Sequence, residues 1–290
     1  MAVTTVMVLR SRVFISAWLL AGCIGDDTSA EGEVSQNVIA PNGVSLNGVS
    51  LNGVSLNGTT ISAVSTGQPL TGTSAVGSKW TAKLSNGATL PLRIDSAVVG
   101  TGTNSDLWMY GISYQTSTTW TPLCGVDAAL APVLAVTVAG VWNTQSGVAG
   151  GGAYTSSSTQ FTIACRAKTI AKCVELGYKT WKGYTNQLTS CVRLLRADFC
   201  GDGTPHTVDG QTLNLYDNVG VQADTQPWSP EAEWTPAGAR CVTKTGETRF
   251  SNLGLAVPAC VKGKELTTTC GTSFGPGTTL IDELPTNLMQ

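Results

Sequence analysis

The sequence predicts a mainly β fold of the α+β class, an antiparallel, disulfide-stapled domain with two short helices. We expect a signal peptide and an Asn-Gly-rich repeat spacer to precede this domain. Charged residues make up only 12% of the chain and glycine supplies 33 of 290 residues, a composition typical of turn-rich β proteins. Nine cysteines, eight of them after residue 120, predict the disulfides.

The N-terminus has the features of a secretory leader over residues 1–22. Arg10 and Arg12 precede the apolar run Val13–Leu20, which is too short to span a membrane. The run ends in Leu-Ala-Gly-Cys, which resembles the lipobox of bacterial lipoproteins, in which the cysteine becomes the acylated first residue. We therefore expect Cys23 to be lipidated, with an ordinary signal peptide as the alternative.

Two segments separate Cys23 from the expected domain. Residues 23–41 are small and acidic and are interpreted as a flexible tether. Residues 42–58 repeat the pentad Asn-Gly-Val-Ser-Leu, and Asn-Gly favours tight turns. Barely three repeats is the minimum for a stable stack, so a short solenoid-like coil and a semi-ordered spacer both stay open.

Residues 59–165 are expected to form a β-rich region. Two alternating segments, 80–84 and 88–94, flank Ser-Asn-Gly and predict a hairpin. Leu107–Tyr114 alternates as a half-buried strand does, and Val133–Val141 is a β-branched run typical of a central strand. Residues 147–158 are expected to be a flexible Gly/Ser loop, and 160–164 another strand.

Residues 166–270 form the cysteine-rich part, in which two helices are predicted. Apolar residues recur at i, i+3, i+4 and i+7 from Ile170 and again from Leu188, and Gly177 is placed to end the first helix. Each helix buries one cysteine in this reading. We expect a strand at 212–216, a Pro-rich loop between Trp228 and Trp234, and a frayed tail over 271–290.

The cysteines that remain after Cys23 are even in number, and in an oxidising compartment they predict four disulfides. Eight cysteines allow 105 pairings, so spacing alone does not determine the connectivity. Sequential pairing is the default expectation. It joins Cys124 to Cys165, Cys173 to Cys191, Cys200 to Cys241, and Cys260 to Cys270.

Three motifs in this part of the chain are similar to those of a known domain family. They are the segment 171–181, AKCVELGYKTW, the segment 196–203, RADFCGDG, and the segment 206–210, HTVDG. Together they resemble the ADYC domain, a family found largely in exported lipoproteins of myxobacteria and named for its Ala-Asp-Tyr-Cys motif. Phe199 replaces the tyrosine here. The resemblance covers roughly residues 120–245 and implies a compartment and an architecture, but it supplies no established activity.

One candidate polar site surrounds the only histidine of the chain. It comprises Asp198, Asp202, His206, Asp209 and Asp217. Carboxylates on glycine-permitted turns suit Ca²⁺, although Asp and Gly are also the ordinary residues of turns that hold no metal. We expect structural turns and no cofactor, with calcium as the alternative. Zinc is disfavoured because its thiolate ligands would be consumed by oxidation.

The leading functional interpretation is a non-enzymatic binding or structural module. An envelope hydrolase using His206 with Asp202 or Asp209 is the alternative. The segment 271–275 matches G-x-S-x-G, yet that motif needs a preceding strand, a following helix and a later histidine. We expect a lipid-anchored envelope protein, with the outer membrane favoured over the inner. Its expected partners are the membrane and an envelope protein or glycan.

Nucleic acid is not expected as a partner. The net charge is −2, whereas phosphate binding requires a clustered basic surface. The short basic clusters at 166–172 and 179–182 are interpreted as solvated faces.

Overall fold

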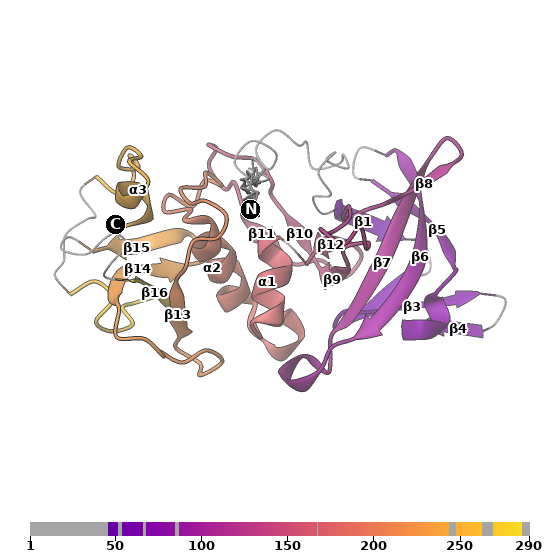
Figure 1. Cartoon of the computed structure of the whole chain (residues 1–290), viewed down its shortest axis with the longest axis horizontal. Helices are drawn as coiled ribbons and strands as arrows, with labels where there is room; N and C mark the ends of the chain where they lie inside the picture. Colours follow the sequence, from indigo (N-terminus) through magenta and orange to yellow (C-terminus); the bar gives the residue numbers. More distant parts are fainter. Residues whose placement is uncertain are drawn as a thin grey trace, which may run out of the picture.

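A computed structural model describes residues 46–51, 54–65, 68–84, 87–166, 168–243, 248–262 and 269–285. The leader, Cys23 and the tether lie outside these residues. The described residues form mainly antiparallel sheets with few short helices, as the sequence predicts. In Figure 1 a β-rich half, coloured indigo to magenta, and a second β half, coloured orange, flank two central helices.

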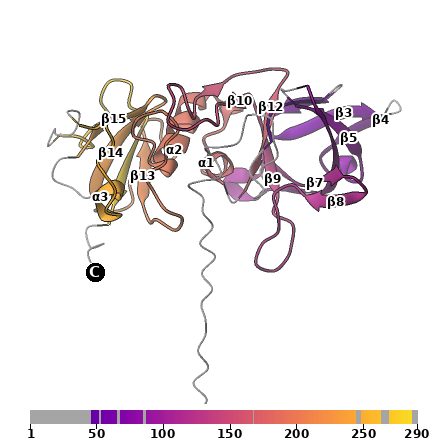
Figure 2. The same ribbon diagram turned by 90° about the horizontal axis from the view of Figure 1, so that it is seen from above.

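The first half is built on one seven-stranded antiparallel sheet that closes on itself, because β6 pairs with both β5 and β7. Figure 2 shows these strands wrapping around an interior. In sheet order the strands are β6 (Thr89–Val99), β5 (Lys79–Lys83), β1 (Leu46–Leu51), β12 (Phe161–Cys165), β9 (Ala135–Ala139), β7 (Trp108–Thr116) and β8 (Thr119–Pro122).

The predicted hairpin is confirmed as β5–β6, with Trp80 opposite Leu92. Gly87 follows the turn at φ 84°, a conformation that glycine adopts without a steric cost. The predicted strands at 107–114, 133–141 and 160–164 correspond to β7, β9 and β12. The alternation of β7 fails in its centre, because Met109 to Ser113 are all buried. One face of this strand, with Tyr110 and Ile112, packs in the core of the first half. The other face, with Met109, packs in the core that contains the helices.

Smaller sheets complete the first half. β2 (Val54–Asn57), β3 (Thr60–Ser65) and β4 (Gln68–Thr71) form a three-stranded sheet, followed by a 3₁₀ turn, η1 (Gly72–Ala75). The described parts of the pentad repeat are therefore strands, β1 and β2. Residues 147–158, expected to be a loop, include the short strand β11 (Tyr154–Thr155), which pairs with β10 (Val141–Trp142).

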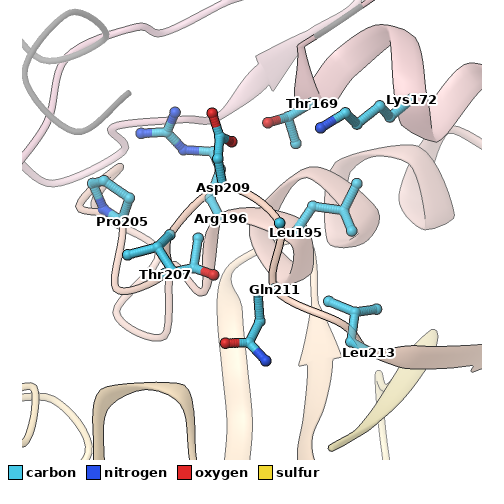
Figure 3. Close-up of a pocket in the computed structure, with 11 residues that line it drawn as sticks. Thr169, Lys172, Leu195, Arg196, Pro205, Thr207, Asp209, Gln211 and Leu213 are labelled. Carbon is cyan, nitrogen blue, oxygen red and sulfur yellow. The ribbon is translucent and has the colours of Figure 1, made fainter. Parts of the chain in front are cut away.

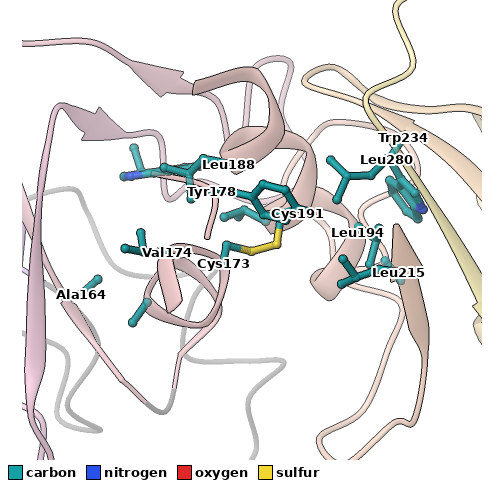
Figure 4. Packing of buried hydrophobic residues seen from close by; sticks show 14 of the residues in the cluster. Ala164, Cys173, Val174, Tyr178, Leu188, Cys191, Leu194, Leu215, Trp234 and Leu280 are labelled. Carbon is teal, nitrogen blue, oxygen red and sulfur yellow. A yellow bond between two sulfur atoms is a disulfide. The ribbon is translucent and has the colours of Figure 1, made fainter. Parts of the chain in front are cut away.

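The two predicted helices are confirmed as α1 (Thr169–Glu175) and α2 (Thr185–Arg196). Two 3₁₀ turns, η2 (Gly102–Asn104) and η3 (Thr180–Lys182), lie beside them. Cys173 and Cys191 are fully buried and bonded to each other, so the disulfide joins the inner faces of both helices (Figure 4). Among the described residues, no helix has the length and apolar character that a membrane crossing requires.

The second half is a four-stranded antiparallel sheet. Its order is β13 (Asn214–Asp217), β16 (Leu280–Leu284), β14 (Ser229–Thr235) and β15 (Gly238–Val242), with α3 (Arg249–Asn252) alongside. Two expectations were wrong here. The supposed tail supplies β16, an inner strand whose five residues are all buried, and the supposed Pro-rich loop is β14.

Buried charge holds this sheet against α2. Arg249 is fully buried and forms ion pairs with Glu231, at 2.7 Å, and with Asp282, at 2.8 Å. It also donates to the carbonyl oxygen of Leu194 in α2, at 2.6 Å. Burial and the neighbouring Glu231 raise the pKa of Asp282, because two carboxylates share one guanidinium in a fully buried site.

All eight cysteines of the described residues form disulfides. The sequential expectation is confirmed for Cys124–Cys165 and Cys173–Cys191. It is wrong for the other four cysteines, which pair as Cys200–Cys260 and Cys241–Cys270. These two bonds overlap along the chain; Cys241 lies in β15, whereas Cys200, Cys260 and Cys270 lie in turns.

Candidate functional site

The segment that resembles the ADYC motif lies directly after α2. Ala197 ends the helix at φ 51° and ψ 40°, the left-handed conformation that usually favours glycine. Its N–H donates to the carbonyl oxygen of Leu194 at 3.0 Å, and the N–H of Asp198 donates to that of Arg193 at 2.9 Å. The chain therefore reverses direction within one residue and turns the next side chain inward.

Asp198 is the centre of this turn. It is 1% exposed and forms an ion pair with Arg193, which is 2% exposed. Its two carboxylate oxygens also accept the N–H groups of Asp202, at 3.1 Å, and Gly203, at 2.9 Å. Both oxygens of Asp198 are thus used within the protein. The arrangement fixes the loop to α2 and does not present the carboxylate to a ligand.

The next two residues of the motif also point inward. Phe199 packs its ring against Trp234 and Phe250, each with ring centroids 5.2 Å away. Cys200 forms the disulfide with Cys260. The ring of Phe199 fills the space between α2 and the second sheet. The hydroxyl that a tyrosine would carry at position 199 is absent.

His206 stabilises the end of α2. Its backbone N–H donates to the carbonyl oxygen of Arg196 at 3.0 Å, and Nδ1 of its ring lies 3.1 Å from the carbonyl oxygen of Ala197. A carbonyl only accepts, so Nδ1 carries the proton in this arrangement. Within the described part of the chain, no carboxylate lies within hydrogen-bonding distance of the ring. The geometry therefore gives His206 a capping contact and no acid–base partner.

The remaining aspartates of the candidate polar site lie apart. Asp202 accepts the N–H of Thr204 at 2.9 Å, and Asp209 is exposed on the loop that follows. Asp217, at the end of β13, accepts the N–H groups of three residues of the next turn, at 2.6 to 3.2 Å. It also accepts the hydroxyl of Tyr178 at 3.0 Å. Burial and this carboxylate raise the pKa of Tyr178.

The five predicted residues therefore do not form one cluster: three lie at the motif turn, Asp209 lies on the next loop, and Asp217 lies at the end of β13. Where the chain is described, one group of three potential metal ligands comes together, namely Glu233, Cys241 and Cys270. Its cysteines are bonded to each other. The G-x-S-x-G match is also a turn: Gly271 and Gly275 donate their N–H groups to Glu233, at 3.0 and 3.1 Å, and strand β16 follows.

A groove runs beside α1, near the motif. It consists of three adjoining cavities, of about 110, 620 and 230 Å³. The first two share Lys172, Leu195 and Leu213, and the second and third share Asn104 and Glu175. We call this surface the α1 groove. Figure 3 shows its first cavity, with Lys172, Leu195 and Leu213 towards one side and Pro205 and Thr207 towards the other.

The walls of the α1 groove are held firmly. Asn104 donates its side-chain N–H to the carbonyl oxygen of Glu175 at 2.9 Å, which joins the turn before β7 to the end of α1. On that turn, Asp106 forms ion pairs with Lys179 and Lys182 and accepts from Trp181 at 3.2 Å. Burial opposes ionisation of Asp106, but these donors outweigh it and lower its pKa to about 2.

Lys179 corrects one expectation. The cluster at 179–182 was interpreted as a solvated face, yet Lys179 is 1% exposed and also donates to the carbonyl oxygen of Thr103 at 2.8 Å. The groove itself was not anticipated from the sequence. Its lining comes from five separate stretches between residues 99 and 225, and no spacing pattern joins them.

The lining of the α1 groove is partly apolar and partly polar. Leucines supply much of its apolar part, and amides, hydroxyls and a few charged groups supply the polar part. Among the described residues that line the three cavities, none is aromatic. β13 lies along the middle cavity and is an edge strand of its sheet, pairing there with β16. The groove therefore offers hydrogen-bonding groups and apolar contact, without a surface for stacking rings.

Comparison with known proteins gives one match. No curated protein and no solved structure matches the chain. The family model of the ADYC domain matches residues 72–248, from the turn before β5 to the start of α3. This span takes in most of the closed sheet, both central helices, the motif turn and all three cavities of the α1 groove. Since the match extends over more than half of its length, the chain belongs to the ADYC domain family.

Proposed function

We propose that this chain is an exported, lipid-anchored protein of the cell envelope, a lipoprotein of the myxobacterial type. In this proposal its ADYC domain binds another envelope component without catalysing a reaction. The observation that carries the proposal is the pairing of every cysteine after residue 120 in disulfides. Disulfides of this number persist in oxidising compartments. Cys23 is the one cysteine left over, and it ends the sequence that resembles a lipobox.

Export and lipidation are tested together by intact-mass analysis of the protein extracted from membranes. We expect residues 1–22 to be absent, Cys23 to carry a lipid, and no thiol to react before reduction. Cys23→Ser should release the chain from the membrane fraction. A retained leader or free thiols in the native protein would overturn the proposal. Separation of inner and outer membranes on a density gradient then tests the outer membrane, which we favour.

The α1 groove is the binding surface in this proposal. Its middle cavity, of about 620 Å³, lies within the range of about 300–1,000 Å³ that ligand pockets span. Its lining favours a segment of another envelope protein over a glycan, because sugar rings pack best on aromatic faces and peptides pair with edge strands. An extended segment beside β13 would gain main-chain hydrogen bonds, with the leucines of the lining as its apolar contact.

A photo-crosslinking residue at Thr225, in the middle cavity, tests this surface in cells. We expect adducts with a protein from Thr225 and none from Val76, which is exposed on the first half. Ala223→Trp should fill the cavity and abolish the adduct, whereas Ala88→Trp, a matched change at an exposed hairpin residue, should not. Equal adducts from both positions, or none from Thr225, would exclude the groove as the binding surface.

A further inference from the structure

The connection between β8 and β9 carries an exposed apolar tip, which we define as residues 126–132, VDAALAP. All seven residues are exposed, and six of them are apolar. In Figure 2 the connection stands out from the closed sheet beside the β9 label. Large apolar side chains exposed together on a projecting element mark an interaction surface.

The apolar tip is a structured hairpin. The Cys124–Cys165 disulfide fixes its base to β12, and Val126 pairs with Pro132 across it. Asp127 closes the turn, because its Oδ1 accepts the N–H groups of Ala129 and Ala131, each at 2.9 Å. The backbone N–H of Asp127 also donates to the carbonyl oxygen of Ala131 at 2.9 Å. The one charged side chain of the tip is thus engaged with its own backbone.

Leu130 stands at the end of this hairpin. It is 79% exposed, more than the other large apolar side chains of the described part. Its φ is 61°, a left-handed conformation that a leucine adopts at a steric cost. The fold therefore holds a leucine in an unfavourable conformation that directs it to the surface. An asparagine would fit this backbone better and would be more soluble.

The tip lies at the end of the closed sheet where β1 begins. β1 begins at Leu46, which is opposite Ile163 in β12. β12 runs on to Cys165, which is opposite Ala135 at the start of β9 and bonded to Cys124 at the base of the tip. Since β1 and β12 are antiparallel, Leu46, the first described residue, lies near the end of β12 that carries Cys165. Leu46 and the base of the apolar tip therefore share one end of the closed sheet.

We propose that the apolar tip inserts into the lipid interface of the membrane that anchors the chain. This inference rests on the proposed lipidation, because Leu46, the first described residue after Cys23, lies at the same end of the sheet as the tip. Seven residues are too few for a stable protein interface, which buries about 800 Å² on each partner. They suffice for shallow insertion, which adds to an acyl anchor and fixes the orientation of the domain.

The test uses the full exported chain with Cys23→Ser, so that binding does not depend on the acyl group. Flotation with neutral vesicles of phosphatidylcholine and phosphatidylethanolamine measures the partition coefficient. We expect Leu130→Asn to lower it about tenfold, the order expected for losing one buried leucine. Leu255→Asn is the matched control, since Leu255 is 46% exposed in the second half, and it should leave binding unchanged. Added salt should change the coefficient little.

The outcomes separate this inference from the proposed function. Equal binding by the Leu130→Asn variant and its parent, or an equal loss from Leu255→Asn, overturns the insertion of the tip. Self-association in solution that Leu130→Asn abolishes, without a change in vesicle binding, also overturns it and assigns the tip to contact between copies. If Cys23 carries no lipid but the tip still binds vesicles, the proposed lipidation is refuted and the proposed insertion of the tip is supported.

Discussion

Replacing Asp198 with asparagine tests whether the motif turn is structural. Asp198 and Arg193 are both almost fully buried and paired with each other. The substitution keeps the shape of the side chain but removes its charge. It also places an NH₂ group where one carboxylate oxygen now accepts N–H groups, so that donors face donors. Arg193 would then lie buried without its counter-charge.

The size of the effect follows from what Arg193 retains. Breaking a buried ion pair by removing one partner costs about 3–5 kcal/mol. Arg193 keeps its hydrogen bonds to the carbonyl oxygens of Gly151 and Pro236. The loss of unfolding free energy should therefore lie near the lower limit of this range. We therefore expect Asp198→Asn to lower the free energy of unfolding by about 3 kcal/mol. For a domain of this size that corresponds to a fall in Tm of about 6–12 °C.

Urea unfolding at neutral pH, with the disulfides intact, measures the free energy directly. The matched control is Glu175→Gln, which removes the ion pair between Glu175 and Arg166. The side chain of Arg166 is 42% exposed and that of Glu175 is 25% exposed. We expect that pair to contribute less than about 1 kcal/mol. A double variant with Arg193→Met should lose less than the sum of the single losses, because no charge is left alone. A loss below about 1 kcal/mol for Asp198→Asn would refute the reasoning.

Three further predictions follow from the same contacts. Replacing Cys200 and Cys260 together with serine opens a bond of sequence separation 60 and should cost about 4 kcal/mol, and non-reducing peptide mapping should recover this pair. Asp106 has its pKa lowered from 3.8 to about 2, so its ion pairs stabilise the fold above pH 4; that stability should be lost as the pH falls towards 2, and Asp106→Asn should flatten this part of the profile. A chelator should leave Tm unchanged, because Asp198 and Asp217 are already satisfied by the protein; a reproducible fall would support the calcium alternative instead.

The elements that the sequence predicted correctly are those with a local pattern. Both helices were expected because apolar residues recur at helical spacing from Ile170 and Leu188, and the hairpin because alternation flanks an Asn-Gly turn. The errors concern partners distant in sequence. β16 lies in a segment without strong alternation, and it is a strand because β13 and β14 bury both of its edges. The pairing of Cys200 with Cys260 depends on the same non-local packing.

At the candidate site too, the sequence predicted the residue types correctly but not their contacts, and the reason is different. The residue types around His206 suggested a polar cluster, but Asp198 turns inward to Arg193 and Asp217 turns inward to Tyr178. A carboxylate beside glycines in a turn is equally suited to bind backbone N–H groups and to bind a ligand, and the sequence does not show which are nearer. The α1 groove could not be predicted at all, since its walls meet only after the two helices pack between the sheets.

This arrangement separates what holds the domain together from what meets a partner. All four residues of the motif turn face inward: Ala197 ends a helix, Asp198 pairs with Arg193, Phe199 fills the core and Cys200 forms a disulfide. Substitutions there should lower stability and reduce binding only through the loss of folded protein. Substitutions at exposed residues of the α1 groove, such as Ala223 and Thr225, and in the apolar tip should change binding at nearly constant Tm. A motif variant that stays fully folded yet loses its partner would be incompatible with this division, because it would require an inward-facing turn to touch the ligand.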